Sequence, residues 1–210
     1  MNVTDDLISG LAAQAGSEPY RSVAGIRRVL AVTALAALAI VLAANWAGFG
    51  LRSDFSAMIL RAPFLFKVAG AAALAAGAFL LMRRIALPAG GTPAWYFLLP
   101  GIALFLLRAG LDPIWHPRAA DVVPGSCTIE ISLLALPALA LILRALRNAA
   151  PTRPTATGAI AGVLAGAMGV IAHAMVCRND SGISVAVWYG LGLVIMAGLG
   201  ALLGRRLLRW

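Results

Sequence analysis

The stretch PTATGAIAGVLAGAMGVIAHAMVC, residues 154–177, contains no Asp, Glu, Lys or Arg. A transmembrane helix needs roughly 20 predominantly apolar residues, so this stretch is long enough to cross a bilayer. Gly158, Gly162 and Gly166 recur in it at four-residue spacing, and small residues at that spacing allow two helix backbones to approach closely. We expect these glycines to serve packing within the chain, with a homodimer contact as the alternative.

The remainder of the chain has the same character. Of 210 residues, 61% are hydrophobic and 12% are charged, and the mean hydropathy is +0.91. Because a soluble domain typically has about 25% charged residues, this composition predicts an all-α polytopic membrane protein. Six charge-poor stretches predict six transmembrane helices, the third effectively beginning at Trp95 and the fourth extended back to about Cys127. They are residues 29–51, 62–82, 85–107, 131–143, 154–177 and 181–204.

The basic residues predict an orientation. With a cytoplasmic N-terminus, eleven of them fall on the inner side and six on the outer side, and basic residues favour the cytoplasmic side. An even number of helices then places both termini in the cytoplasm. The inner group is Arg21, Arg27, Arg28, Arg83, Arg84, Arg144, Arg147, Arg153, Arg205, Arg206 and Arg209, and the outer group is Arg52, Arg61, Lys67, Arg108, Arg118 and Arg178. Since topology accounts for the positive charge, we expect no nucleic-acid partner.

Signatures of catalysis and ion-coupled transport are missing from the sequence. It contains no Ser-x-x-Lys, no His-Glu-x-x-His and no Gly-rich phosphate loop before a Lys. Coupled transporters carry ionisable residues near the bilayer midplane, whereas Lys67, Arg108, Glu130 and Arg144 lie near predicted helix ends. We therefore predict that the protein is not an enzyme. A membrane thiol–disulfide oxidoreductase is the alternative, and a small transporter is the third possibility.

The two cysteines are the best candidates for a chemical site. The predicted topology brings Cys127 and Cys177 to the outer ends of the fourth and fifth helices, and His173 lies one helical turn before Cys177. A disulfide is chemically permitted in an oxidising outer compartment, and Cys and His also bind soft or borderline metals such as zinc. A structural disulfide, a redox- or metal-responsive site and two unrelated cysteines all remain open. His116 is predicted in the preceding outer loop, and we expect no cofactor beyond transient soft-metal binding.

Residues 2–20 are too polar to span a bilayer, yet they show helical patterning. Thr4 is a predicted helix N-cap, Asp5 and Asp6 follow in the first turn, and Gly16 is a predicted helix end. The apolar residues at helical spacing are Leu7, Ile8, Leu11, Ala12 and Ala15. Anionic inner-leaflet lipids repel an acidic helix, so we predict that a groove in a cytoplasmic protein is the partner of this segment.

Four motifs carry a family resemblance: TDDLISGLA at residues 4–12, PTRPTATGAIAGVLAGA at 151–167, WYGLG at 188–192 and GRRLLRW at 204–210. Together with two separated cysteines and six predicted spans, they resemble the NrsF family of bacterial inner-membrane anti-sigma factors over essentially the whole chain. In one position the chain departs from the family pattern, which often has a histidine directly before the second cysteine. Here Val176 precedes Cys177, and His173 stands one turn earlier.

The resemblance implies that the protein holds an extracytoplasmic-function sigma factor at the inner membrane and releases it under envelope, heavy-metal or oxidative stress. Thr4, Asp5, Leu7, Ile8 and Leu11 match the family's N-terminal motif, and we include Asp6 in the predicted partner-binding set. By the same resemblance Cys127 and Cys177 match the paired cysteines, which with His173 form the predicted sensor. We predict a cytoplasmic partner-binding segment over residues 1–28 and a six-helix membrane domain over residues 29–210.

Overall fold

The computed structural model describes residues 3–17, 23–50, 52–86, 94–115, 126–149 and 151–208. These residues form eight α-helices and two short 3-10 helices, and they contain no strand. The elements are α1 Val3–Ser17, α2 Val23–Phe49, α3 Phe55–Met58, α4 Ala62–Ile85, η1 Trp95–Leu98, α5 Leu99–Trp115, α6 Cys127–Leu146, η2 Arg147–Ala149, α7 Pro154–Ala174 and α8 Gly182–Leu207. Six segments are long and apolar enough to cross a membrane, which confirms the predicted six-helix, all-α architecture.

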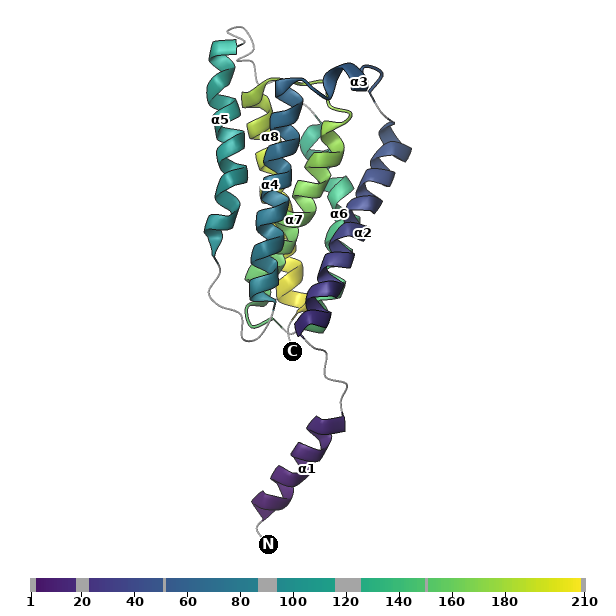
Figure 1. The fold of residues 1–210 in the computed structure, drawn as a ribbon, viewed down its shortest axis with the longest axis vertical. Coiled ribbons are helices and arrows are strands. Elements are labelled where there is room, and N and C mark those ends of the chain that lie inside the picture. Colours follow the sequence, from purple (N-terminus) through teal and green to yellow (C-terminus); the bar gives the residue numbers. More distant parts are fainter. Residues whose placement is uncertain are drawn as a thin grey trace.

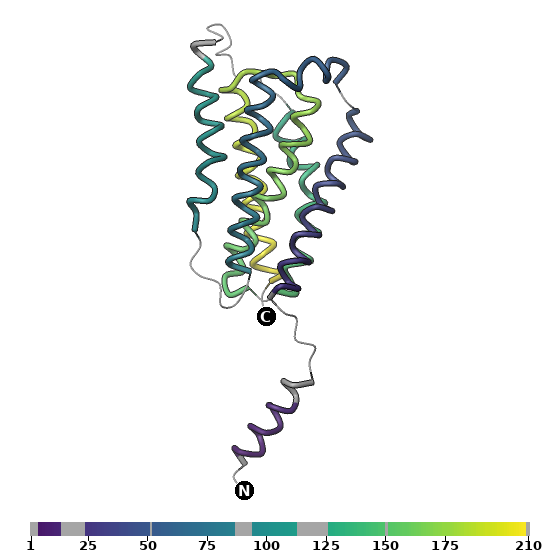
Figure 2. Tube along the Cα trace, in the orientation of Figure 1, coloured from purple at the N-terminus to yellow at the C-terminus, as the bar shows by residue number. Residues whose placement is uncertain are grey.

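The six long helices run side by side as one bundle, with α7 inside it (Figures 1 and 2). α7 packs against α8, α4 and α6, while α2 packs on α6, and α5 packs on α4 and α8. Within its apolar window 72% of α7 is buried, against 17–44% for the other five candidate spans. The Ala- and Gly-rich composition of α7 explains its central place, because a helix with small side chains can be surrounded closely by its neighbours.

The glycine face of α7 is used within the chain. A Cβ atom at Gly158 would lie 2.2 Å from the carbonyl oxygen of Gly200, and one at Gly162 would lie 2.0 Å from that of Met196. No side chain fits at such distances, so glycine at these two positions lets α7 and α8 touch backbone to backbone. The prediction that these glycines serve internal packing is confirmed.

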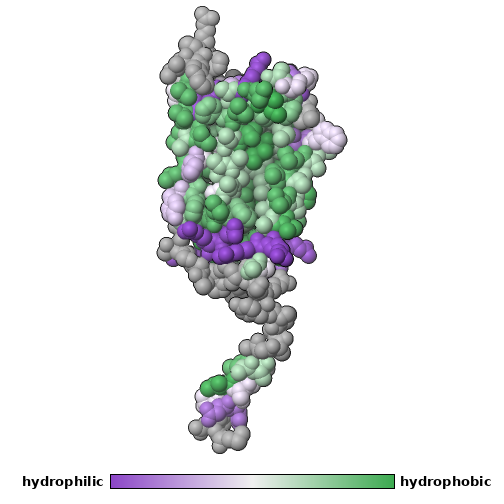
Figure 3. All heavy atoms as spheres, viewed as in Figure 1, coloured by the Kyte–Doolittle hydropathy of each residue, from purple (hydrophilic) through white to green (hydrophobic). Residues whose placement is uncertain are grey.

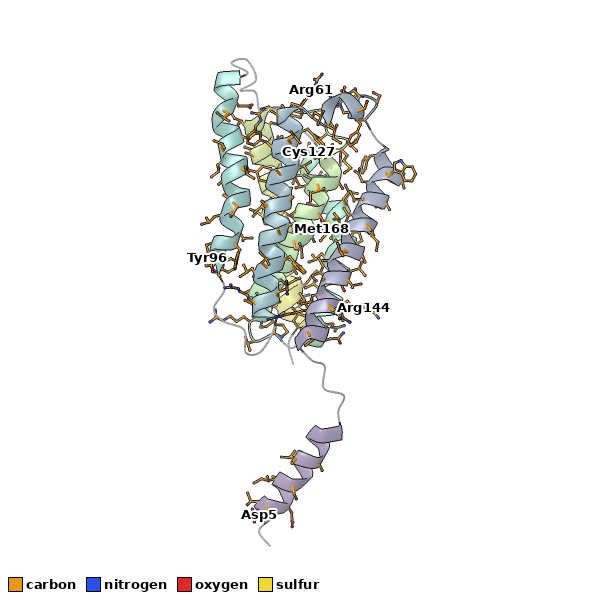
Figure 4. The ribbon with its side chains drawn as sticks, in the orientation of Figure 1. Asp5, Arg61, Tyr96, Cys127, Arg144 and Met168 are labelled. Carbon is orange, nitrogen blue, oxygen red and sulfur yellow. The ribbon has the colours of Figure 1, made fainter. Side chains whose placement is uncertain are left out.

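The two ends of the bundle differ, and we call them the terminus end and the cysteine end. At the terminus end α2 begins and α8 ends, and Arg144 lies there; at the cysteine end lie α3 and Cys127 (Figures 1 and 4). Hydrophobic side chains cover the visible side of the bundle, and a hydrophilic band crosses the terminus end (Figure 3). An apolar girdle closed by a charged band is consistent with a membrane protein.

The first helix differs in two details from the prediction. Thr4 lies inside α1, which begins at Val3, so its predicted role as N-cap is wrong. The helix also continues through Gly16 to Ser17, because glycine weakens a helix without being required to end it. The apolar side chains Leu7, Ile8 and Leu11 are 57–62% exposed, and α1 stands apart from the bundle (Figure 1).

The second helix begins earlier than the apolar stretch predicted. α2 starts at Val23 and includes Arg27 and Arg28, which are both exposed. A helix does not have to end where the hydrocarbon ends, so hydropathy marks the membrane-crossing part and not the helix itself. The proposed division at residues 28 and 29 concerns the membrane boundary and stays a prediction.

Candidate functional site

Cys127 and Cys177 lie together at the cysteine end. Cys127 is the first residue of α6, and Cys177 lies in the turn that follows α7, where its backbone N–H donates to the carbonyl of His173 at 2.9 Å. The two Sγ atoms are 3.9 Å apart, and both cysteines are free. A disulfide has an S–S distance of about 2.05 Å, so these are two thiols in contact. Helix packing thus brings together two residues that are far apart in the sequence.

His173 completes a group of three potential metal ligands. One ring nitrogen of His173 and the sulfur atoms of Cys127 and Cys177 all lie within 4.8 Å of one another. Two thiolates bound to one tetrahedral zinc, each with a Zn–S distance of about 2.3 Å, would have their sulfur atoms about 3.8 Å apart. The observed 3.9 Å separation fits such a site. The other predicted histidine, His116, lies outside the described residues.

The surroundings of His173 are unusual for a buried polar side chain. It is 3% exposed, and neither ring nitrogen has a hydrogen-bond partner among the described residues. Its Nδ1 atom lies 3.3 Å from Oε2 of Glu130 without hydrogen-bond alignment, and its ring packs edge-on against Tyr189 at a centroid distance of 5.8 Å. Leaving a buried polar group without a partner typically costs about 1–3 kcal/mol. A bound ion is one way to satisfy such a group.

Neighbouring groups lower the pKa of Cys177. The thiol of Cys127, acting as hydrogen-bond donor, lowers the pKa of Cys177 below its ordinary value. Burial opposes this shift, whereas the imidazole of His173 and the ammonium group of Lys67 act in the same direction. Because the thiolate is both the nucleophile and the metal ligand, the site favours the reactive form of Cys177.

A buried polar network holds the turn that carries Cys177. Lys67 of α4 donates to the carbonyl of Asn179 and pairs with Oδ1 of Asp180 at 2.9 Å. Arg108 of α5 pairs with Asp112 one helical turn away and donates to the carbonyl of Asp180 at 2.8 Å. Lys67, Arg108 and Asp112 are 1–3% exposed, and charges buried this deeply are found paired.

The same network also fixes the start of α8. Oδ2 of Asp112 accepts hydrogen bonds from the hydroxyl of Ser181 at 2.9 Å and from the backbone N–H of Ile183 at 3.1 Å. The sequence alone indicates Lys67 and Arg108 only as charges near the ends of predicted helices. The signal that could have revealed the network is the Arg108–Asp112 pair at i,i+4 spacing in an otherwise apolar helix.

The predicted partner-binding residues occupy a different part of the molecule. Thr4, Asp5, Asp6, Leu7, Ile8 and Leu11 all lie on α1, and their side chains are exposed. Figure 4 shows Asp5 on α1, beyond the terminus end, whereas Cys127 lies at the opposite end of the bundle. The structure therefore does not join the predicted partner site and the predicted sensor.

Comparison with known proteins identifies relatives over nearly the full length. The family model described as "NrsF: Negative regulator of sigma F" matches residues 11–210. The chain is 34% identical to the probable anti-sigma-F factor NrsF of Azospira oryzae, over 99% of both chains. It is also 34% identical to the anti-sigma-F factor NrsF of Caulobacter vibrioides, again over 99% of both chains. No solved structure matches the chain. The full-length similarity and the family match show that this chain belongs to the NrsF family, whose model describes negative regulators of sigma F.

Proposed function

We propose that the chain is a multi-pass anti-sigma factor of a bacterial inner membrane, with both termini in the cytoplasm. It holds a cytoplasmic sigma factor of the extracytoplasmic-function type and releases it on envelope, metal or oxidative stress. Membership of the NrsF family carries the proposal, and it supports a negative regulator of a sigma factor. The six candidate spans and the eleven-to-six distribution of basic residues support the membrane location and the orientation.

We assign capture of the sigma factor to α1. The helix presents Leu7, Ile8 and Leu11, each more than half exposed, together with Asp5 and Asp6 in its first turn. Isolated helices of this length are marginal in water, and most helical stability comes from packing an apolar face. An exposed apolar stripe beside acidic residues suits a groove with a basic rim on a protein partner.

We assign sensing to Cys127, Cys177 and His173. A soft metal ion would be held by the two sulfur atoms and one imidazole nitrogen, a ligand set typical of zinc and related ions. Alternatively, an oxidant that accepts two electrons would join the two Sγ atoms and release the two thiol protons. Disulfide formation would shorten the Sγ–Sγ distance from 3.9 Å to about 2.05 Å and so draw the start of α6 toward the turn after α7. A metal ion would bind at the observed separation and would link the same two segments to each other and to His173.

The polar network offers a route from the sensor to the helices. The turn that carries Cys177 is bonded to α4 through Lys67 and to α5 through Arg108. It is also bonded to the segment just before α3 through Arg52, whose Nη1 donates to the carbonyl of Cys177 at 3.4 Å. A movement of Cys177 would therefore act on several helices at once. α6 continues into η2 and α7 begins at Pro154, both at the terminus end, which is where a shift between the two helices would reach the cytoplasmic face.

Purification of the tagged chain from its own host tests the proposal. A sigma factor should co-purify with the wild-type protein, should be lost when residues 2–16 are deleted, and should be released when Cd²⁺ or an oxidant is added. Reporter fusions at residue 3, residue 120 and after Trp210 should read inside, outside and inside. A periplasmic terminus would contradict the mechanism, since a sigma factor is cytoplasmic. Catalytic oxidation of added thiols without a bound sigma factor would favour the oxidoreductase instead.

A further inference from the structure

A groove opens between α6 and α8 at the terminus end of the bundle. It has a volume of about 740 Å³. Its apolar part is lined by Ala140 and Leu141 of α6 and by Leu203 and Leu207 of α8. Its polar rim consists of Arg144, Arg147 and Asn148, all exposed. Apolar walls with a cationic rim at one end form an amphipathic site.

The position of the groove indicates that it is open to the bilayer. All of its lining residues belong to two candidate membrane spans, Cys127–Ala149 and Gly182–Leu207. The apolar walls lie about one turn deeper in α6 than the arginines, which lie where that helix ends. The groove thus extends from the hydrocarbon region into the headgroup region, and its contents come from the bilayer.

Charge selects the kind of lipid. Arg147 Nε donates to the carbonyl of Leu207 at 3.2 Å, which uses one of five guanidinium N–H donors and holds this side chain at the rim. Arg144, in the last turn of α6, adds a second full positive charge. The helix C-termini at this end contribute only about half a negative charge each, so the rim is net cationic. Basic pockets between transmembrane helices on the cytoplasmic side are a recurrent type of site for anionic headgroups.

The acidic helix α1 is the rival occupant, and position decides against it. α1 stands apart from the bundle (Figure 1), and the walls of the groove belong to two candidate membrane spans. A helix that carries Asp5 and Asp6 in its first turn would have to leave water to reach those walls. A slender acyl chain with a phosphate at its end fits the same space in both shape and charge.

We infer that the α6–α8 groove binds one anionic phospholipid of the cytoplasmic leaflet. Its acyl chain lies between the apolar walls, and its phosphate is bound by Arg144 and Arg147. The inference goes beyond the proposed function and depends only on its membrane topology. Because α6 begins with Cys127 and ends at this groove, the bound lipid would fasten the terminus end of the helix that carries half of the proposed sensor.

Native mass spectrometry of the purified full-length protein in detergent tests the site, with phosphatidylglycerol and phosphatidylcholine of identical acyl chains as probes. One phosphatidylglycerol should bind with clear preference. Changing Arg144→Gln and Arg147→Gln together should weaken its binding on the order of thirtyfold, as expected for the loss of two cationic contacts. The matched control is Arg205→Gln with Arg206→Gln, which removes the same charge from the same end but lies outside the groove, and it should change binding by a few-fold at most.

A second pair of variants tests the apolar part without changing charge. Ala140→Phe should fill the groove and displace the lipid, whereas Ala36→Phe, on an exposed face of α2, should not. Equal binding of the two lipids, or equal loss in site and control variants, would overturn the inference. A third result would also overturn it: a peptide of residues 1–20 binds the wild-type protein and loses binding in Ala140→Phe, while phosphatidylglycerol does not bind. Co-purification of the sigma factor is scored separately, so failure of the proposed function remains distinguishable from failure of the lipid site.

Discussion

The two ends of the bundle use charge in opposite ways. At the cysteine end Lys67, Arg108 and Asp112 are buried, and each is bonded to the turn between α7 and α8 or to the start of α8. At the terminus end the arginines of α2, α6 and α8 are exposed, and a hydrophilic band crosses this end of the bundle in Figure 3. Buried charges have to be paired, so they specify one arrangement, whereas exposed charges are free to meet lipid or a partner.

This difference in the burial of charge suits the two ends to the two proposed tasks, sensing and capture of the sigma factor. A sensor has to convert a small chemical event into movement, and the cysteine end is tied together by bonds from α4, α5 and α8 around Cys177. Capture of a partner needs accessible surface, and the terminus end together with α1 provides it. Four predictions test the contrast, in order of decreasing effect.

The largest effect is expected from Asp112→Ala. It leaves Arg108 buried without its ion-pair partner and removes the acceptor of Ser181 and Ile183. Removing one partner of a buried pair costs about 3–5 kcal/mol in the free energy of unfolding. Chemical unfolding in detergent, followed by circular dichroism, measures the change. A loss no larger than that of an exposed arginine at the terminus end would contradict the buried network.

The next effect concerns binding at the opposite end. Leu7→Ala with Leu11→Ala should weaken sigma-factor capture by more than about 2 kcal/mol, because interface anchors commonly cost more than about 1 kcal/mol each. Membrane insertion should be unchanged, and transcription that depends on the sigma factor should rise without stress. Leu60→Ala is the control, since Leu60 is 83% exposed but lies between α3 and α4 at the cysteine end. Undiminished capture in the double variant would move the binding site to the segment from Arg144 to Arg153.

The cysteine pair should affect the response more than the stability. The thiols are free, so Cys127→Ser with Cys177→Ser should lower the free energy of unfolding by only about 1.5 kcal/mol, the order of the cost of burying a hydroxyl. Loss of a disulfide that closes a loop of some fifty residues would cost about 4 kcal/mol. The response to added Cd²⁺ or oxidant should disappear. Protein abundance and sigma-dependent transcription are measured together in the same cells. Normal abundance with a full response would exclude these residues as the sensor, and low abundance with proportional derepression would indicate a structural disulfide.

The smallest effect is expected at the terminus end. Arg84→Gln removes an exposed charge whose guanidinium lies 4.8 Å from the ring centroid of Phe97 and whose Nη1 donates to the Tyr96 hydroxyl at 3.5 Å. Exposed contacts of this kind contribute about 0.5–1 kcal/mol. Thermal unfolding of this variant and of Asp112→Ala, measured under the same conditions, compares the contributions of the two ends to stability. Similar losses in the two variants would mean that burial does not distinguish the ends.

Hydropathy and charge determined the class of fold without any structure. Uninterrupted apolar stretches have few solutions other than transmembrane helices, because backbone polar groups have to be paired inside lipid. The glycine spacing in residues 154–177 likewise predicted close packing, and the full-length family resemblance rested on residues visible in the sequence. Helix boundaries were less accurate, since a helix such as α2 extends beyond the apolar stretch that marks it.

Distances between helices were decided only by the tertiary structure. The sequence placed Cys127, His173 and Cys177 at one end of the bundle, but their approach to within 4.8 Å depends on how α6 and α7 pack. The bonds from Lys67 and Arg108 to the turn after α7, and the groove between α6 and α8, follow from the same packing. The physical reason is that hydropathy acts along one helix at a time. Packing between helices depends on the shapes of many side chains, which no single stretch of sequence contains.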